Sequence, residues 1–163
     1  MVSVQRAVSV DRKEVTMAPQ PFIYFLKWVS HYHKALQAHY AQASHRRHNP
    51  DVNALLAFLA HNEGALARVI EAYEHDAPDT LLNAWFKISP SLVHVVRPDS
   101  LRFDPDAGLS EVVDQVLKVD QGLIEVYEML LRQANSEDLR LALEDLISEE
   151  HREAVRLMAC ELV

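Results

Sequence analysis

Apolar side chains recur along this chain at alternating steps of four and three residues, in four long segments whose interiors contain no proline. This spacing places the apolar positions on one face of an α-helix, whereas a half-buried strand would alternate with a period of two. The pattern predicts helices over residues 21–44, 50–76 and 110–135, and a fourth from residue 136 nearly to the C-terminus. The predicted fold class is therefore all-α.

The predicted helices begin at residues that suit the start of a helix. Asn49 can accept a hydrogen bond from the first free backbone N–H groups, and Pro50 suits the first helical position, where no N–H is needed. By the same reasoning, Ser110 and Ser136 are the expected N-caps of the last two long helices.

The connections between the predicted helices are short, long and short. Helices of about 25 residues, about 37 Å long, pack economically side by side, and short connections make antiparallel hairpins. The middle connection can cross the whole bundle, and Asp79 is expected to cap a short helix there that runs through Trp85 and Phe86. We predict a four-helix bundle domain over residues 20–163, preceded by a flexible N-terminal tail over residues 1–19.

One polar residue interrupts the apolar face of each long helix near its midpoint. These residues are His33, Glu63, Asp120 and Glu150. In a bundle of equal helices the midpoints meet at one level, so we expect a single buried site of one imidazole and three carboxylates. Burying ionised carboxylates together is costly unless a cation, a proton or hydrogen-bond donors compensate.

The two halves of the chain also echo each other. The segments "SHYHKALQAHY" (residues 30–40) and "LKVDQGLIEVY" (residues 117–127) align so that His33 matches Asp120 and Tyr40 matches Tyr127. This pattern and the short, long, short connectivity resemble the ferritin-like superfamily, and its rubrerythrin-type branch in particular. The resemblance implies a ferritin-like four-helix bundle.

In that superfamily a di-iron centre takes a glutamate from each of the first and third helices, and a glutamate followed three residues later by a histidine from each of the others. The resemblance matches Glu63 and Glu150 to the glutamates of the paired motifs, and Asp120 to the third-helix glutamate.

The other ligand positions depart from the family pattern. His33 stands where the first-helix glutamate is expected, while Leu66 and Glu153 stand at the two histidine positions. The resemblance therefore implies a degenerate di-iron ligand pattern.

Two hypotheses explain the predicted polar site. In the first, which we favour, the bundle is a non-catalytic binding or structural protein that needs no metal. His33 is then an imidazolium, Tyr40 and Tyr127 donate their hydroxyl groups, and one carboxyl group is protonated.

In the second hypothesis, the site binds a single Fe, Mn or Zn ion. The expected ligands are His33, Glu63, Asp120 and Glu150, with Glu153 as an additional ligand and Tyr40 and Tyr127 next to them. Iron with an open coordination position would make the protein an oxidoreductase.

Composition excludes several other classes of protein. The formal net charge is -8, and Arg46-Arg47 is the one tight basic cluster, so we expect no nucleic-acid partner. A single cysteine excludes an internal disulfide, and no apolar run of about 18 residues offers a membrane span. We expect a cytoplasmic protein.

The run "PFIYFLKW" places aromatic side chains around more than one face of the first helix, and "AWF" adds Trp85 and Phe86. This is more apolar surface than one helix can bury within its own bundle. We therefore expect a homodimer, with the crossover segment as the alternative cover, and a further protein partner is compatible with the same surface.

Overall fold

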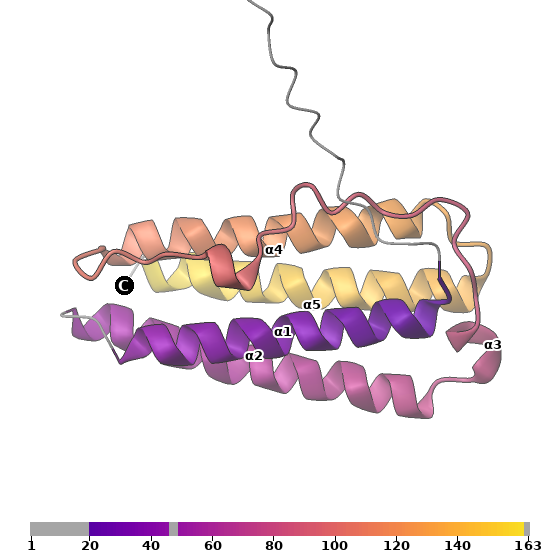
Figure 1. Ribbon diagram of the computed structural model, residues 1–163, viewed down its shortest axis with the longest axis horizontal. Helices are drawn as coiled ribbons and strands as arrows, with labels where there is room; N and C mark the ends of the chain where they lie inside the picture. The colour runs from indigo at the N-terminus through magenta and orange to yellow at the C-terminus, as the bar shows by residue number, and fades with distance from the viewer. Residues whose placement is uncertain (1–19, 46–48, 162–163) are drawn as a thin grey trace, which may run out of the picture.

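Four long helices pack side by side in the computed structural model, which describes residues 20–45 and 49–161 (Figure 1). The long helices are α1 (Phe22–Ser44), α2 (Pro50–Asp76), α4 (Leu109–Leu131) and α5 (Glu137–Glu161). The described residues form no β-strand, and an isolated bridge joins Pro21 and Trp85. The all-α prediction is confirmed, while the tail predicted for residues 1–19 lies outside the described residues.

The connectivity agrees with the sequence pattern. The helices α1 and α2 form one antiparallel hairpin, and α4 and α5 form the other (Figure 1). Between the hairpins the chain passes through the short helix α3 (Asp79–Leu82) and the 3₁₀ turn η1 (Pro98–Ser100). This long connection returns to the opposite end of the bundle, so α4 runs in the same direction as α2 (Figure 1). None of the described helices is long and apolar enough to span a lipid bilayer.

Two of the predicted helix caps are present. The Asn49 side chain accepts hydrogen bonds from the N–H groups of Asp51 (2.9 Å) and Val52 (3.5 Å), ahead of Pro50 at the first helical position. The Ser136 hydroxyl accepts a hydrogen bond from the Leu139 N–H group at 3.2 Å. Each cap satisfies a backbone donor that the first turn of a helix leaves without an intrahelical partner.

The predicted cap at Ser110 is wrong. The helix α4 begins at Leu109, its N-cap is Gly108, and no side chain caps it. The Gly108 carbonyl already accepts from the Val112 N–H group at 3.2 Å, which places Ser110 inside the first turn. Packing explains the earlier start, because Ala107 is buried and Leu109 packs against the core just ahead of Ser110.

The short helix is also shorter than predicted, because α3 ends at Leu82 and Asp79 does not cap it. Past its end, the Ala84 carbonyl accepts a hydrogen bond from the Phe22 N–H group at 2.8 Å. This contact with the start of α1 holds the chain extended, with Phe86 buried in the core and Trp85 on the surface.

The rest of the long connection, residues 83–108, is called the strap below. It lies along the bundle over α1 and α4 (Figure 1). On the α1 side, the Tyr32 hydroxyl donates to the Val96 carbonyl at 2.7 Å. On the α4 side, the Gln133 amide pairs with both the N–H group (2.8 Å) and the carbonyl (2.9 Å) of Ile88. These bonds hold the strap against both hairpins.

Two glycines inside the long helices allow close contact. A Cβ atom at Gly122 would overlap the backbone carbonyl of His94, so the strap can approach α4 only because residue 122 has no side chain. A Cβ atom at Gly64 would overlap the side chain of Gln37 on α1. Packing therefore explains Gly122, whereas at residue 64 the end of the flexible Gln37 side chain could move to make room.

Candidate functional site

The four polar residues that interrupt the apolar faces lie in one buried layer at the middle of the bundle. Each long helix contributes one of them, and each is buried among apolar side chains. The exposed fractions are 1% for His33, 1% for Glu63, 3% for Asp120 and 3% for Glu150. Glu153, one turn beyond Glu150 on α5, is buried beside them. These five residues are called the polar layer below.

His33 lies between two carboxylates of the polar layer. Its Nδ1 is 2.6 Å from Glu63 Oε2, which is a hydrogen bond, and its Nε2 is 3.3 Å from Glu150 Oε1, which is an ion pair without hydrogen-bond geometry. A neutral imidazole carries a proton on only one ring nitrogen. Because both nitrogens face carboxylate oxygens, this arrangement favours the imidazolium form.

The pKa of His33 agrees with that assignment. Burial by itself would lower the pKa, but the carboxylates of Glu150 and Glu63 outweigh it and raise the pKa of His33 to about 10. The imidazolium in turn opposes the effect of burial on Glu63, whose pKa is still raised. His33 thus supplies the positive charge that these glutamates require.

The remaining carboxyl groups of the polar layer have unused acceptors. Within the described residues, Asp120 Oδ2, Glu153 Oε1 and the hydroxyl of Tyr40 are buried and have no hydrogen-bond partner. Burial is the largest cause of the raised pKa of Tyr40, and the charges of Glu63 and Asp120 add to it. Unpaired buried polar atoms are uncommon and are typical of a strained or ligand-binding region.

Protonation lowers the cost of burying these two acids. Burial and the neighbouring carboxylate of Glu150 raise the pKa of Asp120 to about 10. Burial and the carboxylate of Glu63 raise the pKa of Glu153 to about 8. At neutral pH Asp120 is therefore a carboxylic acid, the shift of Glu153 favours the same form to a smaller degree, and His33 carries a positive charge.

Tyrosines surround the polar layer. The Tyr127 hydroxyl donates to Glu150 Oε1 at 3.4 Å, a long hydrogen bond. Sequence reasoning missed Tyr32, whose pKa is raised by burial and by the charges of Glu63 and Glu150. Its position four residues after Trp28 indicates only a stacked pair on one face of the helix, with ring centroids 5.5 Å apart, and does not point to the polar layer.

The polar layer does not fit a di-iron centre. Leu66 offers no donor atom at one histidine position, and His33 already directs both ring nitrogens at carboxylates. In the part of the chain that the structure describes, no three His, Cys, Asp or Glu side chains are arranged to hold a metal ion. The metal-ligand roles expected for His33, Glu63, Asp120, Glu150 and Glu153 stay a prediction.

Comparison with solved structures defines the class of fold. The chain superposes on a crystal structure from Thermotoga maritima, provisionally described as a ferritin-like diiron-carboxylate protein, with a TM-score of 0.62. The match covers 88% of this chain and 95% of the other, at 16% sequence identity. The chain therefore has the ferritin-like fold, as its resemblance to that superfamily implies. No protein-family model and no curated protein matches the sequence.

Proposed function

We propose that this protein is a non-catalytic ferritin-like bundle that acts as a structural or binding homo-oligomer. The charge of its polar layer is compensated by the His33 imidazolium and by protonation of carboxyl groups, without a metal ion. The observation that carries the proposal is the position of His33 between Glu63 and Glu150. The ring occupies the place between the two glutamates where a metal ion would otherwise compensate their charge.

Metal analysis of matched variants tests the proposal. Wild-type protein is purified without added metal, incubated anaerobically with Fe(II) or Mn(II), desalted and analysed for metal content. We expect no stoichiometric metal. The variant His33→Glu removes the internal cation and adds a carboxylate at the first-helix position, so we expect it to gain metal binding.

The control is Lys34→Glu, which makes the same residue at the neighbouring, exposed position of α1. It makes the same change in net charge as replacing the His33 imidazolium by glutamate but leaves the polar layer intact, so it should bind no metal. Stoichiometric metal in the wild type that is lost in Glu150→Ala would contradict the proposal.

A second candidate function is binding of a single Fe, Mn or Zn ion. The unpaired oxygens of Asp120, Glu153 and Tyr40 favour it, because a cation would satisfy acceptors that no described residue satisfies. The ligands would be Asp120 and Glu153, joined by Glu63 and Glu150 if His33 turned away. A bound iron would supply redox chemistry, which would make the protein an oxidoreductase. The metal analysis described above separates this candidate from the first.

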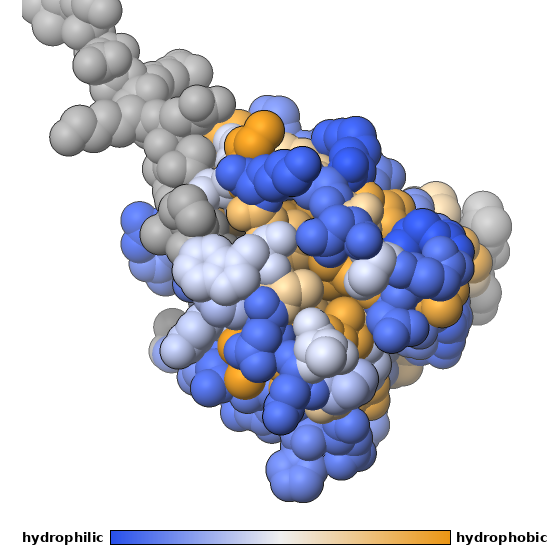
Figure 2. Space-filling view, turned by 90° about the vertical axis from the view of Figure 1, so that its right-hand side faces the viewer, coloured by the Kyte–Doolittle hydropathy of each residue, from blue (hydrophilic) through white to orange (hydrophobic). Residues whose placement is uncertain are grey.

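The homodimer proposal rests on aromatic surface at one end of the bundle. The strap and α4 bury much of the aromatic run of α1, but Tyr24 (53%) and Trp85 (58%) stay exposed, and so does Ile88 (69%). In Figure 2, which looks onto this end, hydrophobic and intermediate residues lie among hydrophilic ones. Trp85→Ser should reduce the mass measured by light scattering from two chains to one, and a wild-type mass of one chain across micromolar concentrations would refute the homodimer.

A further inference from the structure

A pocket of about 410 Å³ opens where the last turns of α1 face the strap. Its apolar part includes Ala43 and Leu101, and the ring of Phe103 lies among them. The chain has 24 acidic residues and a net charge of -8, yet none of the described side chains that line this pocket is acidic. Arg102 and His39 line it instead, so the pocket differs in charge from most of the molecule.

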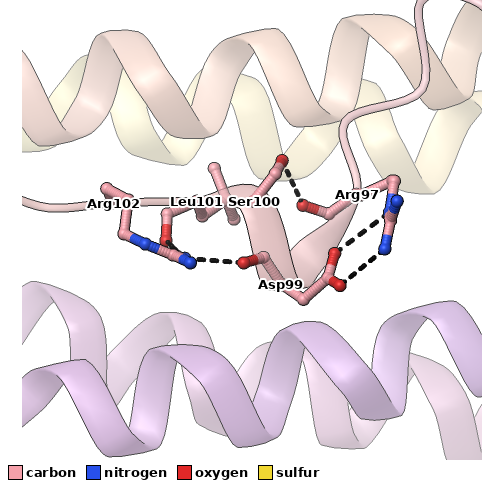
Figure 3. A network of polar contacts seen from close by, with 5 residues as sticks. All are labelled: Arg97, Asp99, Ser100, Leu101 and Arg102. Atoms are coloured by element: carbon pink, nitrogen blue, oxygen red, sulfur yellow. Dashed lines mark hydrogen bonds and ion pairs between the residues drawn. The ribbon is translucent and has the colours of Figure 1, made fainter.

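The guanidinium of Arg102 is held in place by uncharged acceptors (Figure 3). Its Nη1 donates to the backbone carbonyls of Asp99 (2.6 Å) and Leu101 (2.8 Å). Arg97, on the other side of the same turn, instead makes a two-pronged pair with the Asp99 carboxylate, at 3.1 and 2.7 Å. Arg97 is thus neutralised by a carboxylate, whereas Arg102 contacts no carboxylate within the described residues and keeps Nε and Nη2 available.

The aromatic side of the pocket is equally well held. The Nε2–H group of His39 donates to the Leu101 carbonyl at 3.0 Å, since a carbonyl can only accept. The Phe103 ring packs against both His39 and Tyr40, with ring centroids 6.2 Å apart in each pair. The pocket therefore combines a fixed cation with a fixed apolar surface.

We propose that this pocket binds a small organic carboxylate. The carboxylate group pairs with the free edge of the Arg102 guanidinium, whose planar fork matches two carboxylate oxygens. The apolar body of the ligand covers Phe103 and its apolar neighbours, as in pockets where a few polar groups orient a largely apolar ligand. An inorganic anion would pair with Arg102 but would make no apolar contact with the pocket.

Titration of the full chain with three probes tests this site. Sodium benzoate has both the charge and the apolar body, benzyl alcohol has only the body, and inorganic phosphate has only the charge. Calorimetry should show that benzoate binds most tightly, and amide resonances of residues 101–103 should shift in NMR spectra. The proposal is overturned if benzoate does not bind, or if benzyl alcohol or phosphate binds as tightly.

Two arginine variants then assign the charge. Arg102→Gln should weaken benzoate binding about tenfold or more, because a charge-assisted hydrogen bond is lost. The matched control Arg97→Gln removes the same charge from the same turn and should leave the affinity unchanged. Circular dichroism checks that both variants keep the helical fold. Equal loss of affinity in the two variants would show only a long-range charge effect and would overturn the assigned contact.

Discussion

The two halves of the polar layer are similarly buried but differ in how their polar atoms are satisfied. In the closed half, His33 lies between Glu63 and Glu150, and opposite charges compensate one another. In the open half, Asp120 and Glu153 each keep a buried oxygen without a partner among the described residues. Burial alone therefore does not determine the ionisation state of a carboxyl group. Whether the ionised or the protonated form has the lower free energy depends on the partner that the group contacts.

The first prediction breaks the closed half. His33→Ala removes the cation and leaves Glu63 and Glu150 buried together, which should lower the free energy of unfolding by about 3–5 kcal/mol at pH 7. The control Lys34→Ala removes the neighbouring exposed ion pair with Glu71, which solvent screens, so its effect should be much smaller. Urea denaturation followed by circular dichroism measures both, and equal losses in the two variants would contradict the role assigned to His33.

The second prediction concerns pH, which acts on both halves in the same direction. The folded-state pKa of His33 is raised from 6.5 to about 10, and that of Asp120 from 3.8 to about 10. A raised pKa means that the native state holds protons that the unfolded chain has released, so stability decreases as pH rises. His33 loses its contribution between pH 6.5 and about 10, while the penalty from Asp120 grows from pH 3.8 upward.

Each such proton makes the free energy of unfolding decrease by up to about 1.4 kcal/mol per pH unit. Denaturation midpoints measured from pH 6 to pH 9 should therefore decrease steadily. The variant Asp120→Asn, which has no proton to lose, should show a shallower decrease. A midpoint that rises with pH would contradict the protonation states assigned to the layer.

The third prediction exchanges an acid for its amide in each half. Glu63→Gln weakens the charged hydrogen bond to His33 and should cost about 1.5–3 kcal/mol at pH 7. Asp120→Asn keeps an uncharged group in the folded state and removes the proton uptake that folding of the wild type requires at pH 7, so the variant should be more stable than the wild type. Chemical denaturation at one pH compares the two variants directly. If Asp120→Asn proved the more costly exchange, the open half would hold an ionised carboxylate and a bound cation would become the better explanation.

Much of the fold could be predicted from the sequence because it depends on local rules. The apolar periodicity defines the long helices, and Asn49 followed by Pro50 marks a helix start for reasons contained in those two residues. Ser110 was a weaker indication, because its neighbours are also able to begin a helix. Burial of Ala107, a tertiary effect, decided the position of the start.

The sequence predicts which residues form the polar layer, but not their contacts or their protonation. A polar residue at the middle of each apolar face implies convergence, and Glu153 follows Glu150 by one turn. The sequence does not tell which carboxylates His33 contacts, because that depends on its side-chain rotamer in the packed core. Tyr32 was missed because its hydroxyl group bonds to the carbonyl of Val96, a contact made only once the strap lies over α1.

The last and smallest prediction compares Tyr40 with Tyr127, which occupy matching positions in the two similar segments, residues 30–40 and 117–127. Both rings are fully buried, but the Tyr127 hydroxyl donates to Glu150 in the closed half, whereas the Tyr40 hydroxyl has no hydrogen-bond partner among the described residues. Tyr127→Phe should therefore cost about 1 kcal/mol, because Glu150 loses a donor. Tyr40→Phe should be neutral or slightly stabilising, because it removes a buried polar atom that gains nothing from folding.

Thermal or chemical denaturation of the two tyrosine variants at pH 7 measures this difference, and each variant serves as the control for the other because the chemical change is identical. A cost in Tyr40→Phe as large as in Tyr127→Phe would mean that the Tyr40 hydroxyl has a partner in solution. A water molecule or a cation bound between Tyr40, Asp120 and Glu153 would be such a partner. Only for a cation would the loss of stability caused by Tyr40→Phe depend on added metal.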